Sequence, residues 1–593
     1  MFKTITSRQR TSPPAWAVLE RQLIAAMNEA GPLFIEKYTR PGGALIWRED
    51  YPGDGVWADD LYEAFFNWPL FYALGGSSYF SEMAVQEWNA VTRQIEHEYG
   101  RAHKEFISDD DWFHNSENYI YFYYLGMADP SNTEMVRRAR RFAGFYLNED
   151  PAVLNYDPQH RIIRSPFNGS KGPLFHARYA DVQYNLEHGH TTLGPGFALP
   201  PKWHEDETLR RQIHARFDEV VMHGDVVVNL GVVGLATCAY LYTGEAKYKN
   251  WVVEYVEAWL ERIEKNSGII PDNIGLGGQS GENRQGQWWG GFYGWTGRFS
   301  LHMMGSAMML AAECAQLLTG EARYLDLIRS QLDVLLSQGR EQDGKVLVPF
   351  KHTDAGWGEW GAPLPQDPIH LWAASMAPGD WQLLERLRRG SEAEWQTVTP
   401  RGPRTLDDRA WVRFLAGDHP NYPEQILQAN YDEICRRVEM IQGDEADLHL
   451  VDEHHWQVRN PVVTEALVQL TTGGPQTIYW GGLAQGRVRY FDGQRPGLPA
   501  DVAALVTKLG ADSMELTLVN LSVCATREVV VGAGSFGEHQ FLAVQAQDER
   551  VEIDDRYFQV RLLPGTQIEL QIEMQRYINQ PAYAFPAHKG PGI

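Results

Sequence analysis

Carboxylates stand at the start of two aromatic-rich segments of the chain. The segment GVWADDLYEAFFNWPLFYALGG, residues 55–76, opens with Asp59 and Asp60, places Glu63 one turn later, and then becomes almost entirely aromatic or aliphatic. The segment DWFHNSENYIYFYY, residues 111–124, repeats this order with His114 and Glu117. A carboxyl group that packs against aromatic rings loses hydration, which raises its pKa. Glu117 therefore has the surroundings that a general acid needs near neutral pH.

Two carboxyl groups in different surroundings can divide acid and base roles between them. We expect Glu117 to be the protonated acid and Asp59 or Asp60 to be its ionised partner, a pair that suits cleavage of a glycosidic bond. Other readings of the same residues remain open. Asp59 or Asp60 could cap a helix, Glu63 could complete a capping box, and Glu117 could pair with an arginine.

A tryptophan-rich loop is expected to supply a surface for a ring-shaped ligand. The stretch QWWGGFYGWTGRFSLH, residues 287–302, combines glycines with Trp288, Trp289, Tyr293 and Arg298. Glycine-rich backbone disfavours a core helix, and exposed aromatic rings suit stacking on sugars. The alternative is a loop that lies buried beneath another part of the protein.

A basic stretch in an acidic chain suggests contact with an acidic ligand. Residues 158–180 carry arginines that include Arg164 and Arg178 and contain no acid from Pro158 to Ala180, whereas the whole chain has a net charge of −24. Arginine suits bidentate recognition of a carboxylate. The alternative is an outer loop paired with acidic surface. The nearby His188 and His190 lack a third ligand in the motif, so we expect proton transfer or substrate binding there and no metal.

These candidate residues require elements that bring them together, and the chain repeats one such element. An apolar helix, a turn near glycine and an amphipathic helix recur around residues 75, 126, 244 and 320. Helices that are apolar all round must be covered on both sides, whereas amphipathic ones can face solvent. The pattern predicts an (α/α)6-type helical toroid over residues 1–440, in which the inner helices all begin at one mouth.

The sequence pattern changes from helical periodicity to short alternating runs after the predicted toroid. Short alternating runs rich in β-branched residues, such as MELTLVNLS and YFQVRLLPG, predict an antiparallel β-sandwich over residues 441–575. We assign strands to 448–460 and 476–482 as well, loops to 340–365 and 395–420, and a C-terminal arm to 576–593. The fold class is therefore α+β and multidomain.

Composition limits the partners and the compartment. The strong negative charge argues against nucleic acid and anionic membrane. The four cysteines show no metal-binding spacing and are expected to be reduced, and no cofactor-binding motif occurs, so we expect no cofactor. The first residues lack an apolar signal region, and we expect a cytoplasmic protein.

The hairpin series, the acids at the helix starts and the tryptophan loop together resemble the six-hairpin glycosidase superfamily. The likeness is architectural and is greatest to unsaturated glucuronyl hydrolases and to β-glucuronidases with a toroid and a sandwich. It implies exo-acting removal of a uronic acid from an oligosaccharide. Separately, the tail that follows the predicted sandwich leads us to expect a homo-oligomer. Two alternatives remain open: a glycan-binding protein, or a uronate lyase that would use residues among Asn115, Asn118, His114, Tyr119, Tyr184 and His190.

Overall fold

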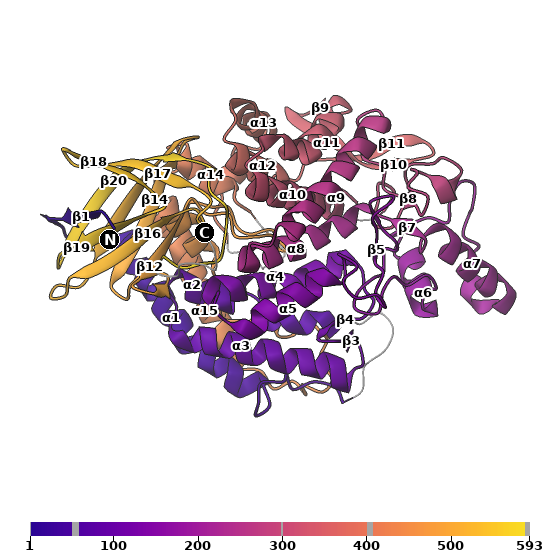
Figure 1. Ribbon diagram of the computed structural model, residues 1–593, viewed down its shortest axis with the longest axis horizontal. Coiled ribbons are helices and arrows are strands. Elements are labelled where there is room, and N and C mark those ends of the chain that lie inside the picture. Colours follow the sequence, from indigo (N-terminus) through magenta and orange to yellow (C-terminus); the bar gives the residue numbers. More distant parts are fainter. Residues whose placement is uncertain (1, 50–57, 298–299, 400–406, 587–593) are drawn as a thin grey trace.

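The computed structural model describes residues 2–49, 58–297, 300–399 and 407–586. A helical part occupies most of the chain, and a β-sandwich, yellow in Figure 1, lies at one end of it. The predicted class, a helical toroid followed by an antiparallel sandwich, is confirmed. Among the described residues, no helix has the length and apolar character needed to cross a membrane.

Apolar helices form the inner ring of the toroid. They are α2 (Trp68–Leu74), α4 (Trp112–Ala128), α8 (Val232–Thr243), α10 (Ser300–Thr319) and α12 (Gln366–Ser375). Each packs beside the next in chain order. The ring closes through residues 457–479, which include α16 (Glu465–Leu467). There the Asn67 side chain donates to the carbonyl of Val462 at 2.9 Å, and the His370 ring bonds the carbonyl of Gln476.

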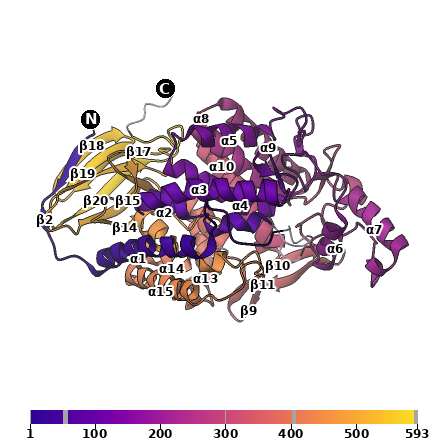
Figure 2. The same cartoon turned by 90° about the horizontal axis from the view of Figure 1, so that it is seen from below.

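A second layer of helices surrounds this ring. It comprises α1 (Ala15–Tyr38), α3 (Ser78–Arg93), α5 (Thr133–Gly144), α9 (Ala246–Lys265), α11 (Asp326–Ser337), α13 (Pro378–Arg388), α14 (Arg409–Leu415) and α15 (Tyr422–Gln442). All of them except α14 bury one face and leave the other in solvent, as the amphipathic pattern predicted, whereas α14 is buried from Ala410 to Phe414. The first helix and α15 lie side by side, although some four hundred residues separate them, and so close the outer layer (Figure 2).

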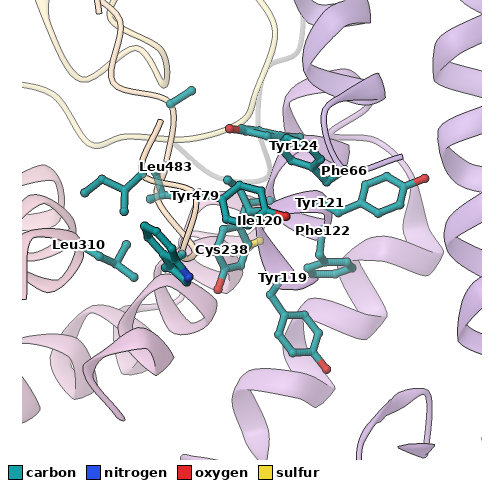
Figure 3. Packing of buried hydrophobic residues seen from close by; sticks show 14 of the residues in the cluster. Phe66, Tyr119, Ile120, Tyr121, Phe122, Tyr124, Cys238, Leu310, Tyr479 and Leu483 are labelled. Carbon is teal, nitrogen blue, oxygen red and sulfur yellow. The ribbon is translucent and has the colours of Figure 1, made fainter. Parts of the chain in front are cut away.

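Aromatic side chains fill the toroid. From Asn115 to Ala128, every residue of α4 is buried, and rings from Tyr119 to Tyr124 point to different sides of the helix (Figure 3). Trp88 of α3, which is fully buried, packs against Tyr121 and Phe122. Each such ring contributes about 2 kcal/mol through burial. Because the inner helices are held on all sides, the residues at their starts have fixed positions.

Two additions extend the toroid beyond its helical hairpins. One holds α6 (Tyr179–Glu187) and α7 (Glu207–Val220). Three short antiparallel strand pairs lie near its base: β3–β4 (Ala102–His103 and Phe106–Ile107), β5–β6 (Tyr156–Asp157 and Ile162–Ile163) and β7–β8 (Gly224–Asp225 and Ile274–Gly275). The other is a sheet of β9 (Arg340–Gln342), β10 (Lys345–Thr353) and β11 (Gly356–Gly361). The prediction of a loop over 340–365 is wrong, because its alternating residues pair as a hairpin.

The sandwich consists of two sheets. One has the order β1 (Thr4–Ser7), β19 (Tyr557–Leu562), β16 (Arg527–Ala533), β12 (Val488–Asp492), β13 (Arg495–Pro496). The other has β14 (Val502–Leu509), β15 (Ser513–Asn520), β20 (Thr566–Gln575), β17 (Gln540–Ala546) and β18 (Glu549–Asp555), with β2 (Gln9–Arg10) on β20. All pairs are antiparallel except β1 with β19.

Two predicted strands are wrong, and two strands were missed. Residues 448–460 and 476–482 form turns and a short 3-10 helix, Gln457–Arg459, because their aromatic side chains enter the toroid and do not pair in a sheet. Conversely, β1 and β2 belong to the sandwich although they precede the toroid in sequence. The division at 440 and 575 remains a prediction.

The C-terminal arm crosses from the sandwich to the toroid. The amide of Ala582 donates to Phe536, and the amide of Tyr583 donates to Leu241 of α8 at 3.0 Å. The Tyr583 ring is fully buried and lies against Gly126 of α4, where a Cβ atom would clash with it. The arm therefore joins the two parts through an aromatic anchor.

Candidate functional site

Three predicted carboxylates meet where two inner helices begin. Asp60 and Glu63 lie on the 3-10 helix Ala58–Ala64 that leads into α2, and Glu117 lies in the second turn of α4. One oxygen from each lies within 4.8 Å of the others. Their exposed fractions are 4%, 0% and 1%. Like charges this close in a buried place repel, so the arrangement favours a shared proton or a bound cation.

Glu117 is held by a tryptophan from outside the helical hairpins. The indole Nε1–H of Trp480 donates to Glu117 Oε1 at 2.7 Å. The Trp480 ring stacks on Phe113 at a centroid distance of 5.5 Å and meets the edge of His302 at 4.3 Å. Burial lowers the pKa of His302, so this imidazole is neutral at neutral pH. The aromatic setting expected for Glu117 is therefore present.

The other two carboxylates also contact the segment that follows α15. Gln457 donates to Glu63 and, at 2.9 Å, to the hydroxyl of Tyr479. His454 Nε2 lies 3.8 Å from Asp60 Oδ1. Gln457 and Tyr479 also line a cavity of about 70 Å³ one to two turns deeper along α2 and α4, beside Phe66 and Ile120. The carboxylate cluster thus lies between the mouth of the toroid and this cavity.

A row of histidine and tyrosine rings leads outward from the cluster. Asp111 caps α4 by accepting from the amides of Phe113 and His114, and its second oxygen lies 2.9 Å from His114 Nδ1. His114 faces Tyr293, which lies 4.7 Å from the ring of His190. Burial raises the pKa of Tyr293, so its hydroxyl stays protonated. His114, His190 and Tyr293, three predicted site residues, therefore lie together.

His190 is oriented by residues of the addition that holds α6 and α7, called the α6–α7 lobe below. Asn185 Oδ1 lies 3.0 Å from His190 Nδ1, which leaves Nε2 as the nitrogen for other contacts. The rings of Tyr184 and His188 lie 5.6 Å and 5.8 Å from His190. His188 is exposed, whereas His190 is buried. The α6–α7 lobe therefore presents a histidine pair at the edge of the site.

The predicted arginines have structural partners. Arg178 pairs with Asp109 at 3.0 Å and with Asp181 at 2.6 Å. The guanidinium of Arg164 lies over the ring of Phe175 at 5.3 Å. These contacts correspond to the alternative of an outer basic loop paired within the protein, and a role of either arginine in substrate binding remains a prediction. Arg298 lies outside the described residues, as does the side chain of Asp59.

The tryptophan loop packs against the β10–β11 hairpin. The rings of Trp288 and Trp289 lie 4.7 Å and 4.6 Å from that of His352. Asp272 fixes the loop, because its carboxylate accepts from the amides of Gly290 and Gly291 at 2.9 Å and 2.8 Å. Both tryptophans are half-buried. They retain exposed ring surface, and stacking on a sugar remains a prediction for them.

The six residues predicted for the uronate-lyase alternative divide between the site and the hydrophobic core. His114, His190 and Tyr184 lie along the row of rings described above. Tyr119 instead stacks on Phe106 at 4.7 Å and accepts from the amide of Ile107, and Asn115 donates to the carbonyl of Asp110. Tyr119, Asn115 and Asn118 are buried. These three residues therefore support the core more than the site.

Some described groups have donor atoms close enough for a cation. They are Asp60 with Glu63 and Glu117, Asp60 with Glu453 and His454, and Asp110 with Asp111 and His114. Carboxylate oxygens suit hard cations such as Ca²⁺ or Mg²⁺. Hydrogen bonds from Trp480 and Gln457 already occupy part of the first group. The expected absence of a metal remains a prediction.

Reasoning from sequence placed His302 at the start of an inner helix but missed Gln457, Tyr479 and Trp480 at the site. These three residues come from the two segments that were assigned to strands. A signal was available, because HHWQ and IYWGG both place large aromatic side chains beside polar groups, as site loops often do.

The ring of helices, the sandwich and the buried acids define a toroid-plus-sandwich protein with a carboxylate site at the starts of its inner helices. Residues 4–347 and 340–468 match the family described as "Domain of unknown function (DUF8034)". The chain belongs to this family. No curated protein gives a significant match.

Solved structures show weaker likeness. A D-mannose isomerase is 10% identical with a TM-score of 0.37, over 64% of this chain and 86% of that one. An inactive alpha-1,6-mannanase variant of Salegentibacter sp. HEL1_6 with alpha-1,6-mannotriose is 14% identical, with a TM-score of 0.27, over 62% and 85%. An unsaturated glucuronyl hydrolase from Streptococcus agalactiae is 9% identical, with a TM-score of 0.33, over 78% and 97%. Every one of these TM-scores is below 0.5, so the matches carry no argument about the superfamily or the activity of this chain.

Proposed function

We propose that this protein is a glycoside hydrolase whose reaction centre is the cluster of Asp60, Glu63 and Glu117. The observation that carries the proposal is the meeting of three buried carboxylates at one place, two from the 3-10 helix Ala58–Ala64 and one from α4. Glycosidases need one protonated carboxyl group to donate to the leaving oxygen and a second, ionised one to act as nucleophile or base. Glu117, against Trp480 and Phe113, is the proposed acid, and Asp60, beside His454, is the proposed ionised partner.

The surroundings of the cluster support a sugar ligand. Phe113, Trp480 and Tyr293 offer aromatic surface, and His114 and His190 offer ring nitrogens for hydroxyl groups. Rings beside polar groups are typical of carbohydrate sites. His114, His188 and His190 also offer ring nitrogens that can hydrogen-bond a carboxylate, which supports the finer proposal of an exo-acting enzyme that removes a uronic acid such as β-glucuronate. A cytoplasmic location and a homo-oligomer are part of the same proposal.

A lyase is the second candidate, because His190, Tyr184 and Tyr293 lie together at the site edge. A lyase needs a base that removes a proton next to the uronate carboxyl group. The raised pKa of Tyr293, which follows from burial, disfavours this tyrosine as an ionised base. The lyase is therefore the second candidate and the hydrolase the first.

One assay separates the candidates. Wild-type protein is incubated with p-nitrophenyl glycosides and with uronate oligosaccharides while nitrophenol and unsaturated uronate are read by absorbance. We expect nitrophenol from the β-glucuronide and a loss of about 10²- to 10⁴-fold in kcat for Glu117→Gln and Asp60→Asn. The matched control is Glu87→Gln, since Glu87 is another fully buried carboxyl group on α3; its activity should stay within about twofold. Unsaturated product would favour the lyase, and binding without turnover would favour a glycan-binding protein.

A further inference from the structure

Gln476 is held in place by three ionisable groups from different parts of the ring. Its amide N–H donates to Asp408 Oδ1 at 3.1 Å, and its side-chain Nε2 donates to Glu465 Oε1 at 2.6 Å. Its carbonyl oxygen accepts from His370 Nε2 at 2.9 Å. All four residues are less than one-tenth exposed. Both backbone groups and the side chain of one residue are therefore fixed inside the toroid.

The bond from His370 has a defined direction. A carbonyl oxygen only accepts, so His370 Nε2 must carry a proton, and Nδ1 lies 2.8 Å from Glu313 Oε1. Burial alone would lower the pKa of His370, but the neighbouring Glu313 carboxylate outweighs this effect and raises it overall. A hydrogen bond in a dry setting is electrostatically stronger than one in water. His370 is thus a firm link between α12 and Gln476.

Only a short piece of chain separates Gln476 from the carboxylate cluster. The segment 476–480 ends at Trp480, whose indole donates to Glu117. Within this stretch, the hydroxyl of Tyr479 accepts from Gln457, which also holds Glu63. The amide of Gly482 donates to the carbonyl of Ile478 at 2.8 Å and so tightens the turn at the end of the segment. An anchor at Gln476 therefore fixes the place of the Trp480 ring.

We propose that Gln476 and His370 are positioning residues that act through Trp480 to orient Glu117. This inference rests on the proposed function for the role of Glu117, whereas the anchoring of segment 476–480 does not depend on any substrate. Neither residue touches the carboxylate cluster in the described structure. In this proposal, His370 on α12 helps to set the position of the Glu117 carboxyl group on α4.

Hydrogen–deuterium exchange of the full chain tests the anchoring directly. His370→Leu removes both ring donors, whereas His370→Gln keeps an amide that can donate to the Gln476 carbonyl. The matched control is Tyr255→Phe, since Tyr255 is equally buried and loses its bonds to Asp225 at 3.0 Å. Peptides covering 474–484 should exchange at least about tenfold faster in His370→Leu and near the wild-type rate in the other two. Unchanged exchange in folded His370→Leu overturns the proposal.

Two further measurements complete the test. If His370→Leu does not fold, Gln476→Leu takes its place, because it removes only the bond to Glu465 and should also speed exchange in 474–484. On a glycoside that the wild-type protein cleaves, His370→Leu, or Gln476→Leu in its place, should have a kcat about tenfold lower with little change in KM and a shifted pH–rate profile. His370→Gln should have kinetics close to those of the wild type. Faster exchange with wild-type kinetics and pH profile would overturn the role toward Glu117. If no substrate is turned over, the proposed function fails, and exchange together with the Trp480–Glu117 distance in a crystal of the variant still decides the anchoring.

Discussion

Replacing Glu465 with glutamine tests the electrostatics of the toroid interior. Glu465 begins α16, and its oxygens accept from Gln476 Nε2 at 2.6 Å and from Asn430 Nδ2 at 3.0 Å. Burial raises the pKa of this carboxyl group from its ordinary 4.5 to about 8. The folded chain therefore keeps a proton that the unfolded chain releases between these values. Stability contributed by this group is highest below pH 4.5, falls as the pH rises to about 8, and changes no further above that.

The size of the effect follows from that interval. Each pH unit between the two pKa values lowers the free energy of unfolding by about 1.4 kcal/mol, because the unfolded chain ionises Glu465 and the folded chain does not. The total loss of stability above pH 8 is therefore at most about 5 kcal/mol. Glutamine at position 465 cannot ionise and therefore removes this loss of stability. Its side chain can still bond Asn430 and Gln476 if the side-chain amide of Gln476 rotates so that its oxygen faces position 465. For a chain of this size, 5 kcal/mol corresponds to about 4 °C in Tm. We expect Glu465→Gln to raise Tm by up to about 4 °C at pH 9 and to change it little at pH 4.5.

A nearby glutamate gives the opposite sign and serves as the control. Burial would raise the pKa of Glu433 on α15, but the bonds from Arg436 and Arg437 outweigh burial and lower it. Its stabilisation is present above the ordinary pKa and is lost as the pH falls through the lowered one. Glu433→Gln should therefore lower Tm at pH 7 and lose this effect in acid. Scanning calorimetry at several pH values measures both variants. An equal Tm change for Glu465→Gln at pH 4.5 and pH 9 would refute the argument.

The remaining predictions concern the site and the ends of the chain. Trp480→Phe keeps the ring stack and removes the indole donor, so steady-state kinetics should show kcat lower by about 10- to 100-fold with KM little changed; an unaltered kcat would count against the proposed acid. Tyr583→Ala should lower stability by about 3–5 kcal/mol in denaturant unfolding, because it empties the space between α4 and α8; a loss under about 1 kcal/mol would contradict the anchor. Arg178→Met should leave KM for a glucuronide unchanged, because Arg178 is paired with Asp109 and Asp181; a tenfold rise would show that this arginine binds substrate. Dialysis against a chelator should leave activity unchanged, and recovery only on adding Ca²⁺ or Mg²⁺ would show a metal site.

The carboxylate cluster could be predicted because helical periodicity is a local property. Asp60, Glu63 and Glu117 stand at the starts of segments whose apolar pattern marks them as inner helices, and inner helices of successive hairpins run the same way. The convergence then follows from the repeat alone. The sandwich was predictable for a similar reason, since β20 alternates buried and exposed residues along most of its length.

Contacts between distant parts of the chain could not be read in this way. Trp480 and Gln457 reach the cluster from two segments that form turns and a short 3-10 helix, and the alternation of aromatic and polar residues there imitates a strand. Likewise, β1 pairs with β19 across almost the whole chain, and nothing within Thr4–Ser7 names that partner. Such pairings depend on what the rest of the fold leaves unfilled, and a local pattern does not contain this information.

The pairing of β1 with β19 has a consequence for folding. Thr4 lies opposite Gln559, so β1 gains its partner only after a very long stretch of chain has folded back on it. The space between α4 and α8 is likewise filled by Tyr583, which lies far from both helices in sequence. Contacts between such distant residues form late, because the entropy of closing a long loop must be met first. Until they form, the helical part would carry an unpaired strand edge and an open apolar space, which are features that chaperones and proteases recognise.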